Sequence, residues 1–164
     1  MISFRRFIGS ILISFVPSSL FRFKRLLLRF MAISYANNVK VNIGVKFYGS
    51  GEISIGNNTW IGPNCKFYTA GNSKITIGNN CDIAPEVAFI CGSHVIGDST
   101  RRAGNSKVFD ILINNGTWIG ARSTILGVEI GNSTVVGALT LVNKDLDSNS
   151  LYIGIPARKI KDLD

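Results

Sequence analysis

Residues 55–66 read IGNNTWIGPNCK, and in this stretch a six-residue pattern occurs twice in succession. Each block begins with an aliphatic residue, continues with glycine or another small residue and then two polar residues, and places a small residue fifth. The pattern returns in residues 77–88 (IGNNCDIAPEVA) and again from Ile113, Ile119, Ile130 and Val136. A period of six indicates a β-helix, in which one short strand forms one wall of a prism and three walls form one coil.

Two positions of each block are expected to point into this prism. The aliphatic first positions would stack in a column made of Ile55, Ile61, Ile77, Ile83, Ile113, Ile119, Ile130 and Val136. The fifth positions are small or β-branched, because a large side chain would not fit a tight corner; they are Thr59, Cys65, Cys81, Val87, Thr117, Ser123, Thr134 and Thr140. Glycine or alanine second, followed by a polar residue such as asparagine, suits the positive φ that corners need. An ordinary β-sandwich has no reason to keep such a period.

Length and composition favour one domain in a reducing compartment. The chain has 164 residues, of which 46% are hydrophobic and only 17% charged, as expected when each coil buries its apolar face against its neighbours. Its three cysteines, Cys65, Cys81 and Cys91, show neither a pairing pattern nor a metal-type spacing. Two of them occupy the small inward position, so we expect buried free thiols in a cytoplasmic protein.

Residues 1–36 lack the repeat and are predicted to form a basic, amphipathic helical segment, while residues 37–164 form the β-helix, with a short C-terminal tail. Residues 1–40 hold seven basic residues and no acidic one, although the whole chain has a net charge of +8. The apolar stretch 7–16 is too short to span a bilayer, which takes about 20 residues, and no small-residue cleavage site follows it. In residues 20–32, one helical face carries Phe23, Leu26, Leu27 and Phe30, and another carries Arg22, Arg25 and Arg29.

Two interpretations of this segment stay open, and they are compatible. A basic helix rich in Phe and Leu suits peripheral contact with the anionic inner face of a membrane. The same helix would also suit capping of the open solenoid end, with packing on a neighbouring subunit. Nucleic acid is not expected as a partner, because the repeat body has no basic stripe that would extend such a patch.

Four short motifs follow one another in the C-terminal half: TWIGA at 117–121, VGA at 136–138, NKD at 143–145 and GIPAR at 154–158. This succession resembles the hexapeptide-repeat O-acetyltransferases, which include galactoside and maltose acetyltransferases and those of surface-polysaccharide assembly. The resemblance covers about residues 41–163. It implies an all-β fold, a left-handed parallel β-helix that is an exception to the right-handed crossover rule. It also implies a homotrimer that binds acetyl-CoA in clefts between adjacent prisms.

The resemblance further implies which residues line the acetyl-CoA cleft: Trp118, Ala121, Ala138, Asn143, Lys144, Arg158 and Lys161. The amides of Ala121 and Ala138 would face the pantetheine arm, and the last two basic residues would approach the nucleotide, where a cation suits a phosphate. Simple solvation of those basic residues is the alternative. The chain departs from the family pattern at residues 125–128, where the turn is one residue short, and at Leu139, which stands where the family has glycine.

His94 is the only histidine, and the repeat fails directly after it, at about residues 95–107. Such a break predicts a loop that leaves a coil, and loops on rigid scaffolds commonly carry function. Acetyl transfer to a hydroxyl needs a general base, and imidazole can take and return that proton near neutral pH. The resemblance places the catalytic base at His94. Asn64 matches an acceptor-binding asparagine, although an ordinary corner residue explains it as well.

Arg101 and Arg102 in the predicted loop could bind an acidic or phosphorylated acceptor or could simply be solvated. Nothing near Cys91 in the sequence would activate a thiolate, so we expect a buried filler rather than a nucleophile. The sequence therefore predicts an acetyl-CoA-dependent O-acetyltransferase that acts on a sugar, free or lipid-linked, in surface-glycan synthesis. The alternatives are an N-acetyltransferase of an amino sugar and a non-catalytic β-helix scaffold. Carbonic anhydrase activity, which the same fold supports, needs three histidine ligands for zinc and is excluded, and no metal is expected.

Overall fold

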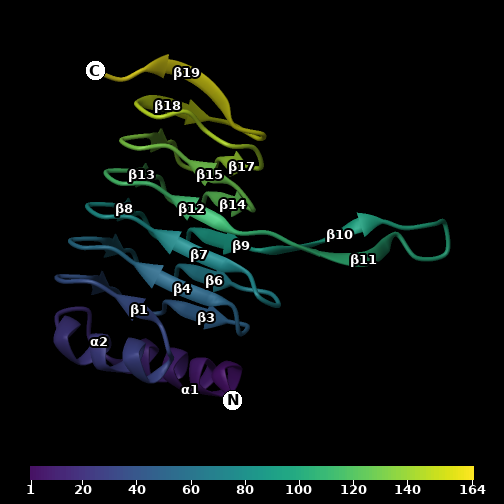
Figure 1. Ribbon diagram of the computed structural model, residues 1–164. Coiled ribbons are helices and arrows are strands. Elements are labelled where there is room, and N and C mark those ends of the chain that lie inside the picture. The colour runs from purple at the N-terminus through teal and green to yellow at the C-terminus, as the bar shows by residue number, and fades with distance from the viewer.

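The computed structural model describes residues 1–164, which form a triangular prism with two helices at its N-terminal end and a hairpin that projects from its side (Figure 1). The helices are α1 (Ile2–Phe15) and α2 (Phe21–Phe30). Three sheets, called here walls A, B and C, form the three faces, and all their strands are parallel except β19 (Arg158–Asp162), the last strand of wall B. Successive coils are stacked so that each strand pairs with the strand of the same wall one coil later.

The strands of each wall follow in chain order. Wall A contains β1 (Ser34–Tyr35), β4 (Glu52–Ile55), β7 (Lys74–Ile77), β12 (Ile111–Ile113) and β15 (Glu129–Ile130). Wall B contains β2 (Lys40–Val41), β5 (Trp60–Ile61), β8 (Asp82–Ile83), β13 (Trp118–Ile119), β16 (Val135–Val136), β18 (Ser150–Ile153) and β19 (Arg158–Asp162). Wall C contains β3 (Lys46–Tyr48), β6 (Lys66–Tyr68), β9 (Ala88–Ile90), β14 (Thr124–Leu126) and β17 (Leu141–Val142). The hairpin consists of β10 (Gly92–Ile96) and β11 (Ala103–Val108).

The predicted inward positions are confirmed. All eight aliphatic first positions are at most 2% exposed, and all eight small fifth positions are at most 1% exposed. On wall C the column is aromatic: the rings of Phe47 and Phe67 stack with centroids 4.9 Å apart, and those of Phe67 and Phe89 with centroids 4.8 Å apart. Such stacked pairs add to the stabilisation that burial alone supplies.

The corner conformation differs from the prediction in one respect. The residue with positive φ is the fourth of each block and not the second: Asn58, Asn64, Asn80, Glu86, Gly116, Arg122, Ser133 and Leu139 all have φ between 54° and 70°. Glycine is needed at the second position for a different reason. A Cβ at Gly56 would lie 2.5 Å from the carbonyl carbon of Gly78 in the next coil. Glycine there permits close stacking of coils, while the fourth residue makes the turn.

At the corner between walls A and B, asparagine side chains supply the hydrogen bonds that link neighbouring coils. The backbone N–H of Asn57 donates to Oδ1 of Asn79 at 2.7 Å, and that of Asn79 donates to Oδ1 of Asn115 at 2.8 Å. The N–H of Asn115 donates in turn to Oδ1 of Asn132 at 3.1 Å. These bonds satisfy the third-position amides that no backbone carbonyl reaches.

The two helices cover the open N-terminal end of the prism (Figure 1), and together they are called the cap here. Arg6 of α1 is 1% exposed and donates to the carbonyls of Gly49 at 3.0 Å and Gly51 at 2.7 Å and to Oγ1 of Thr69 at 3.1 Å. Oγ of Ser10 accepts the N–H of Phe47 at 3.0 Å. The first wall strand already begins at Ser34, before the boundary expected after residue 36. Neither helix is long and apolar enough to cross a membrane.

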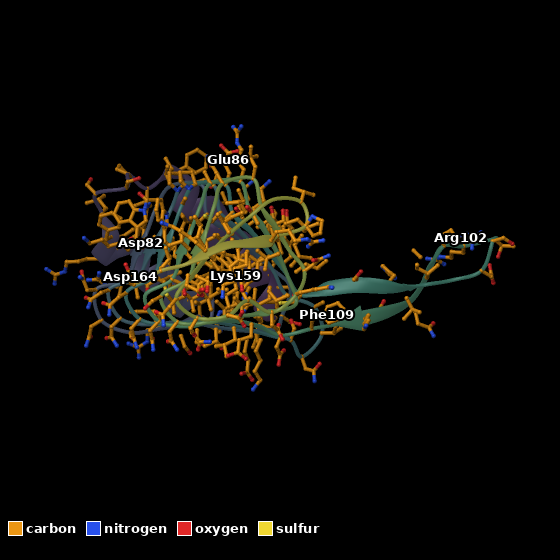
Figure 2. All side chains as sticks on the ribbon, turned by 90° about the horizontal axis from the view of Figure 1, so that it is seen from above. Asp82, Glu86, Arg102, Phe109, Lys159 and Asp164 are labelled. Atoms are coloured by element: carbon orange, nitrogen blue, oxygen red, sulfur yellow. The ribbon has the colours of Figure 1, made fainter.

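The opposite end of the prism is closed by the last residues of the chain. β19 turns back to pair with β18 in the antiparallel sense, with Leu151 opposite Lys161. Figure 2 looks along the prism from this end, and Lys159 of β19 lies over the middle of the triangle. The segment predicted as a short tail is therefore an ordered edge strand.

Candidate active site

The predicted break in the repeat is a long antiparallel hairpin that leaves the corner between walls C and A and extends away from the prism (Figure 2). It starts at Gly92 and ends at Val108, so it is wider than the loop expected at about residues 95–107. His94 therefore lies on β10, opposite Ser106 of β11, and not ahead of a loop. The N–H of Phe109 donates to the carbonyl of Cys91 at 2.9 Å and closes the base of the hairpin.

The ring of His94 is held by its own hairpin. Its Nδ1 lies 2.9 Å from the carbonyl oxygen of Gly104. A carbonyl only accepts, so Nδ1 must carry the hydrogen in the bond, and in the neutral ring the lone pair is then on Nε2. The side chain is exposed, with Nε2 available to take a proton. A neutral imidazole in this tautomer has the free nitrogen with which a general base accepts a proton.

Gly104 is a site residue that the sequence analysis missed. A Cβ on Gly104 would lie 2.9 Å from the carbonyl oxygen of Val95 and 3.2 Å from Cα of Gly97. Glycine at this position thus lets the two strands approach closely enough for the carbonyl to reach His94. The presence of a glycine on each side of the hairpin tip, Gly97 and Gly104, is the only signal in the sequence for this contact.

A hollow of about 450 Å³ opens beside His94, and only one of the two arginines predicted to bind the acceptor lines it. Arg101 lines the hollow together with His94, whereas Arg102 does not line it. Arg102 points from the hairpin tip, far from the prism, in Figure 2. Asp98 accepts hydrogen bonds from the side chain and the N–H of Thr100 and from the N–H of Arg101. These bonds lower the pKa of Asp98 and order the tip.

The corner between walls B and C has free backbone donors. Here the third position of each block is Pro63, Pro85, Ala121 or Ala138. The N–H groups of Ala121 and Ala138 donate to no atom of the chain, whereas the fourth-position amides beside them are used. The N–H of Leu139, for example, donates to the carbonyl of Ala121 at 2.9 Å. The two alanines therefore offer outward donors at the corner where two earlier coils have proline and hence no N–H.

Not all the predicted residues meet within one chain. Asn64 is an exposed corner residue with φ of 59° in the same corner column as Ala121 and Ala138. Asn143 and Lys144 are exposed at the corner between walls C and A, from which the hairpin with His94 also leaves. The two corners are separate in Figure 2. Glu86 marks the corner between walls B and C, Phe109 marks the corner between walls C and A, and the two residues lie on different sides of the triangle.

The remaining predicted residues lie on wall B. Trp118 projects from β13 and is 55% exposed, and Arg158 and Lys161 are exposed on β19 at the C-terminal end. The short turn at residues 125–128 passes through Gly127, whose φ is 54°, and β15 begins directly after it. Leu139 has a φ of 58° and is 60% exposed beside Ala138, where a glycine would be less strained.

The cysteines are fillers, as predicted. Cys65, Cys81 and Cys91 are free and fully buried. Burial raises the pKa of Cys65 to about 12 and that of Cys91 to about 11, so neither is a thiolate at neutral pH. The chain contains no group of three His, Cys, Asp or Glu side chains that could hold a metal ion.

A prism of six-residue repeats with free corner amides and an ordered histidine on a hairpin is the architecture of a hexapeptide-repeat acyltransferase. No protein-family model matches the sequence. Among characterised relatives, galactoside O-acetyltransferase of Escherichia coli (strain K12) is 32% identical over 138 residues, which cover 84% of this chain and 67% of that protein. The putative colanic acid biosynthesis acetyltransferase WcaF of the same organism is 29% identical over 124 residues, covering 66% of this chain and 67% of WcaF.

Solved structures that resemble this chain are also acyltransferases. A hexapeptide-repeat-containing acetyltransferase of Vibrio cholerae, complexed with acetyl-CoA, superposes with a TM-score of 0.86 and 25% identity over 99% of this chain and 87% of that one. AntD, an N-acyltransferase of Bacillus cereus in complex with dTDP and 3-hydroxybutyryl-CoA, gives a TM-score of 0.72 and 26% identity over 82% of this chain and 74% of that one. The chain belongs to the hexapeptide-repeat acetyltransferase family, and its fold is the left-handed parallel β-helix that the resemblance implied.

Proposed function

We propose that the protein transfers the acetyl group of acetyl-CoA to a sugar hydroxyl in surface-glycan synthesis, with His94 as the general base. The observation that carries the proposal is the bond between Nδ1 of His94 and the carbonyl of Gly104, which leaves Nε2 as the proton acceptor. The relatives support the proposed chemistry, because one is named a galactoside O-acetyltransferase and the other, WcaF, a putative acetyltransferase of colanic acid biosynthesis.

The reaction would proceed by direct attack. Nε2 of His94 takes the hydroxyl proton while the acceptor oxygen bonds to the thioester carbon, and the developing oxyanion accepts a hydrogen bond from a backbone N–H. Collapse of the tetrahedral intermediate breaks the carbon–sulfur bond, and the imidazolium returns the proton to the CoA thiolate. Because no acyl-enzyme is needed, the buried cysteines play no part.

Acetyl-CoA fits the corner between walls B and C, where the N–H groups of Ala121 and Ala138 are free to donate to amide carbonyls of the pantetheine arm. These donors lie on a different corner from His94, Asn143 and Lys144. A homotrimer would resolve the separation, because the hairpin corner of one copy would then face the alanine corner of the next. Trp118, Arg158 and Lys161 would line the same cleft towards the nucleotide.

The acceptor side would be built from the hollow beside His94. Arg101 lines this hollow and suits an acidic or phosphorylated sugar, whereas Arg102 would contact an acceptor only if the acceptor extended to the hairpin tip. Asn64 would complete the acceptor site from the neighbouring copy. We include in the proposal a glycan acceptor on a lipid carrier and peripheral contact of residues 1–36 with the inner face of the membrane.

A transfer assay with His94→Ala tests the base. Release of free CoA thiol is followed with hydroxyl and amino sugars as acceptors, and we expect a rate about a hundred- to ten-thousand-fold lower in the variant. Val95→Ala is the matched control, because Val95 is exposed on the same strand and does not line the hollow. Unchanged transfer by His94→Ala would refute the assignment.

The same assay separates the alternatives. Acetylation of amines alone by the wild-type protein would favour the N-acyl transfer for which AntD is named. No transfer to any acceptor would favour a scaffold.

Proline substitution tests the acetyl-CoA donors. Ala138→Pro removes one N–H at a position where other coils already contain proline, so the fold should be kept. Loss of one hydrogen bond should raise the KM for acetyl-CoA about two- to tenfold. Pro85→Ala is the matched control and should leave this KM unchanged, while light scattering reports whether each variant keeps the mass of a trimer.

A further inference from the structure

The cap presents an apolar surface to solvent. Half of the exposed large apolar residues of the protein lie in its first 30 residues. The surface, called here the cap face, is made of Phe4, Phe7, Ile11 and Phe15 on α1 and Phe23, Leu26 and Phe30 on α2, each 41–80% exposed. The two helices lie across the N-terminal end of the prism in Figure 1, and three of the cap-face residues of α1 lie beside β3.

The outward direction of these side chains is fixed by what α1 buries. Arg6, Gly9 and Ser10 face the prism, and hydrogen bonds hold two of them: Arg6 to carbonyls of the loop after β3, and Ser10 to the N–H of Phe47. A Cβ at Gly9 would lie 2.4 Å from Cγ of Met31, so α1 also packs tightly on the end of α2. Rotating α1 to bury its phenylalanines would break all of these contacts. The exposure is therefore built into the cap.

The charged side chains on the two helices of the cap are all basic. Arg22 and Arg29 are exposed on α2, and the guanidinium of Arg5 lies 5.2 Å from the ring centre of Phe30. The first acidic residue of the chain is Glu52. Apolar side chains interleaved with arginines complement an anionic lipid surface, in which the rings enter the headgroup region and the guanidinium groups meet phosphates. An ordinary protein partner would need acidic side chains spread over the same apolar area.

A groove continues the cap face onto wall C. It has a volume of about 320 Å³ and runs between α1 and β3, with Phe7, Ile11 and Phe15 on one side and Lys46 and Tyr48 on the other. An apolar groove with a lysine at its edge suits one hydrocarbon chain whose anionic headgroup lies near the ammonium group. The groove and the cap face thus point to the same partner.

We propose that the cap face docks the protein on an anionic lipid bilayer, with α1 and α2 in the headgroup region and the prism standing away from the membrane. This deepens the membrane contact included in the proposed function and needs neither the acetyl transfer nor the identity of the acceptor. In a trimer with parallel prisms, three cap faces would lie in one plane and bind together.

Vesicle flotation of the full chain tests the docking. The vesicles contain phosphatidylcholine alone or an equal mixture of phosphatidylcholine and phosphatidylglycerol, and we expect binding to the anionic vesicles only, weakened by high salt. Phe7→Ser with Phe15→Ser should lower the partition coefficient about tenfold or more, because two rings no longer leave water. Arg22→Gln with Arg29→Gln should lower it about fivefold per residue at low salt.

Two controls match these variants at other places. Ile160→Ser removes an apolar residue that is 52% exposed at the opposite end of the prism, and Lys66→Gln removes an exposed charge from wall C. Both should float like the wild-type protein. Failure of the wild-type protein to bind anionic vesicles, or equal binding by the phenylalanine variant, would overturn the proposal.

The remaining outcomes separate this proposal from others. If the phenylalanine variant changed the oligomeric mass in the absence of lipid, the cap face would be an interface between protein copies, and lipid docking would be refuted. His94→Ala should float like the wild-type protein. Loss of transfer with flotation retained would leave the docking standing, whereas intact transfer without flotation would remove the docking and leave the proposed chemistry.

Discussion

The repeat body and the cap differ in which kinds of side chain they bury. In the body, burial follows the six-residue period, and aliphatic, aromatic and small residues face inward. In the cap, Arg6, Ser10 and Lys24 are buried together with three apolar side chains, while most phenylalanines remain exposed. The difference arises because each coil of the body covers another coil of the same shape, whereas the cap must also satisfy the polar groups of the first coil. Periodicity thus specifies the body, and individual hydrogen bonds specify the cap.

Removal of a stacked ring from the body should produce the largest effect. Phe67 is fully buried between Phe47 and Phe89, so Phe67→Ala should lower the free energy of unfolding by about 3–5 kcal/mol. Urea denaturation at one fixed protein concentration measures the loss. The matched cap variant, Phe15→Ala, should change stability by less than about 0.5 kcal/mol in the absence of lipid, because Phe15 is 80% exposed. Equal losses would remove the contrast between the two regions.

A smaller loss is expected from Arg6→Met in the cap. Methionine keeps much of the buried volume, but the carbonyls of Gly49 and Gly51 lose their donor. Charge-assisted hydrogen bonds of this kind support a loss of about 2–3 kcal/mol, measured in the same denaturation experiment. A stability equal to that of the wild-type protein would show that the cap is held by apolar packing alone, as the body is.

The opposite sign is expected at Lys24, the second buried cation of the cap. Its Nζ has no hydrogen-bond partner, and burial lowers the pKa of the side chain from its usual value of 10.5. The unfolded chain therefore binds this proton more tightly than the folded chain, so stability should rise with pH on the approach to 10.5. Lys24→Met should stabilise the protein by about 1 kcal/mol at neutral pH and reduce that rise. Thermal unfolding of the wild-type protein and of Lys24→Met is measured between neutral and alkaline pH. A variant less stable than the wild-type protein, or one with the same pH dependence, would contradict the prediction.

Much of the body could be predicted from the sequence because each block repeats the same physical constraint. The inward column and the small corner residues, including Cys65 and Cys81, follow from the period alone. The position of the residue with positive φ was predicted wrongly: it is the fourth of each block and not the second. Glycine suggested a positive φ at the second position, where it instead permits close stacking of coils, as at Gly56.

The candidate site was less predictable, since its contacts join residues that no period relates. The position of His94 and the break after it were visible in the sequence. The bond to Gly104, the start of the hairpin at Gly92 and the separation of Arg101 from Arg102 depend on strand register, which a broken repeat does not encode. In the cap, helical spacing correctly grouped Phe23, Leu26 and Phe30, but it could not show that this group remains outside, whereas Leu27 is buried.

The antiparallel strand β19 determines how the stack of coils ends on wall B. A stack of parallel strands ends in rows of unpaired N–H and C=O groups on which another chain could continue the sheet. At one end this edge is occupied by β19, which runs against the direction of the stack and carries Arg158, Lys159 and Lys161. At the other end, helices whose amides are satisfied internally cover the first coil. At the C-terminal end, the open edges are therefore limited to the charged strand β19 of wall B and to the short strands β15 and β17 of walls A and C.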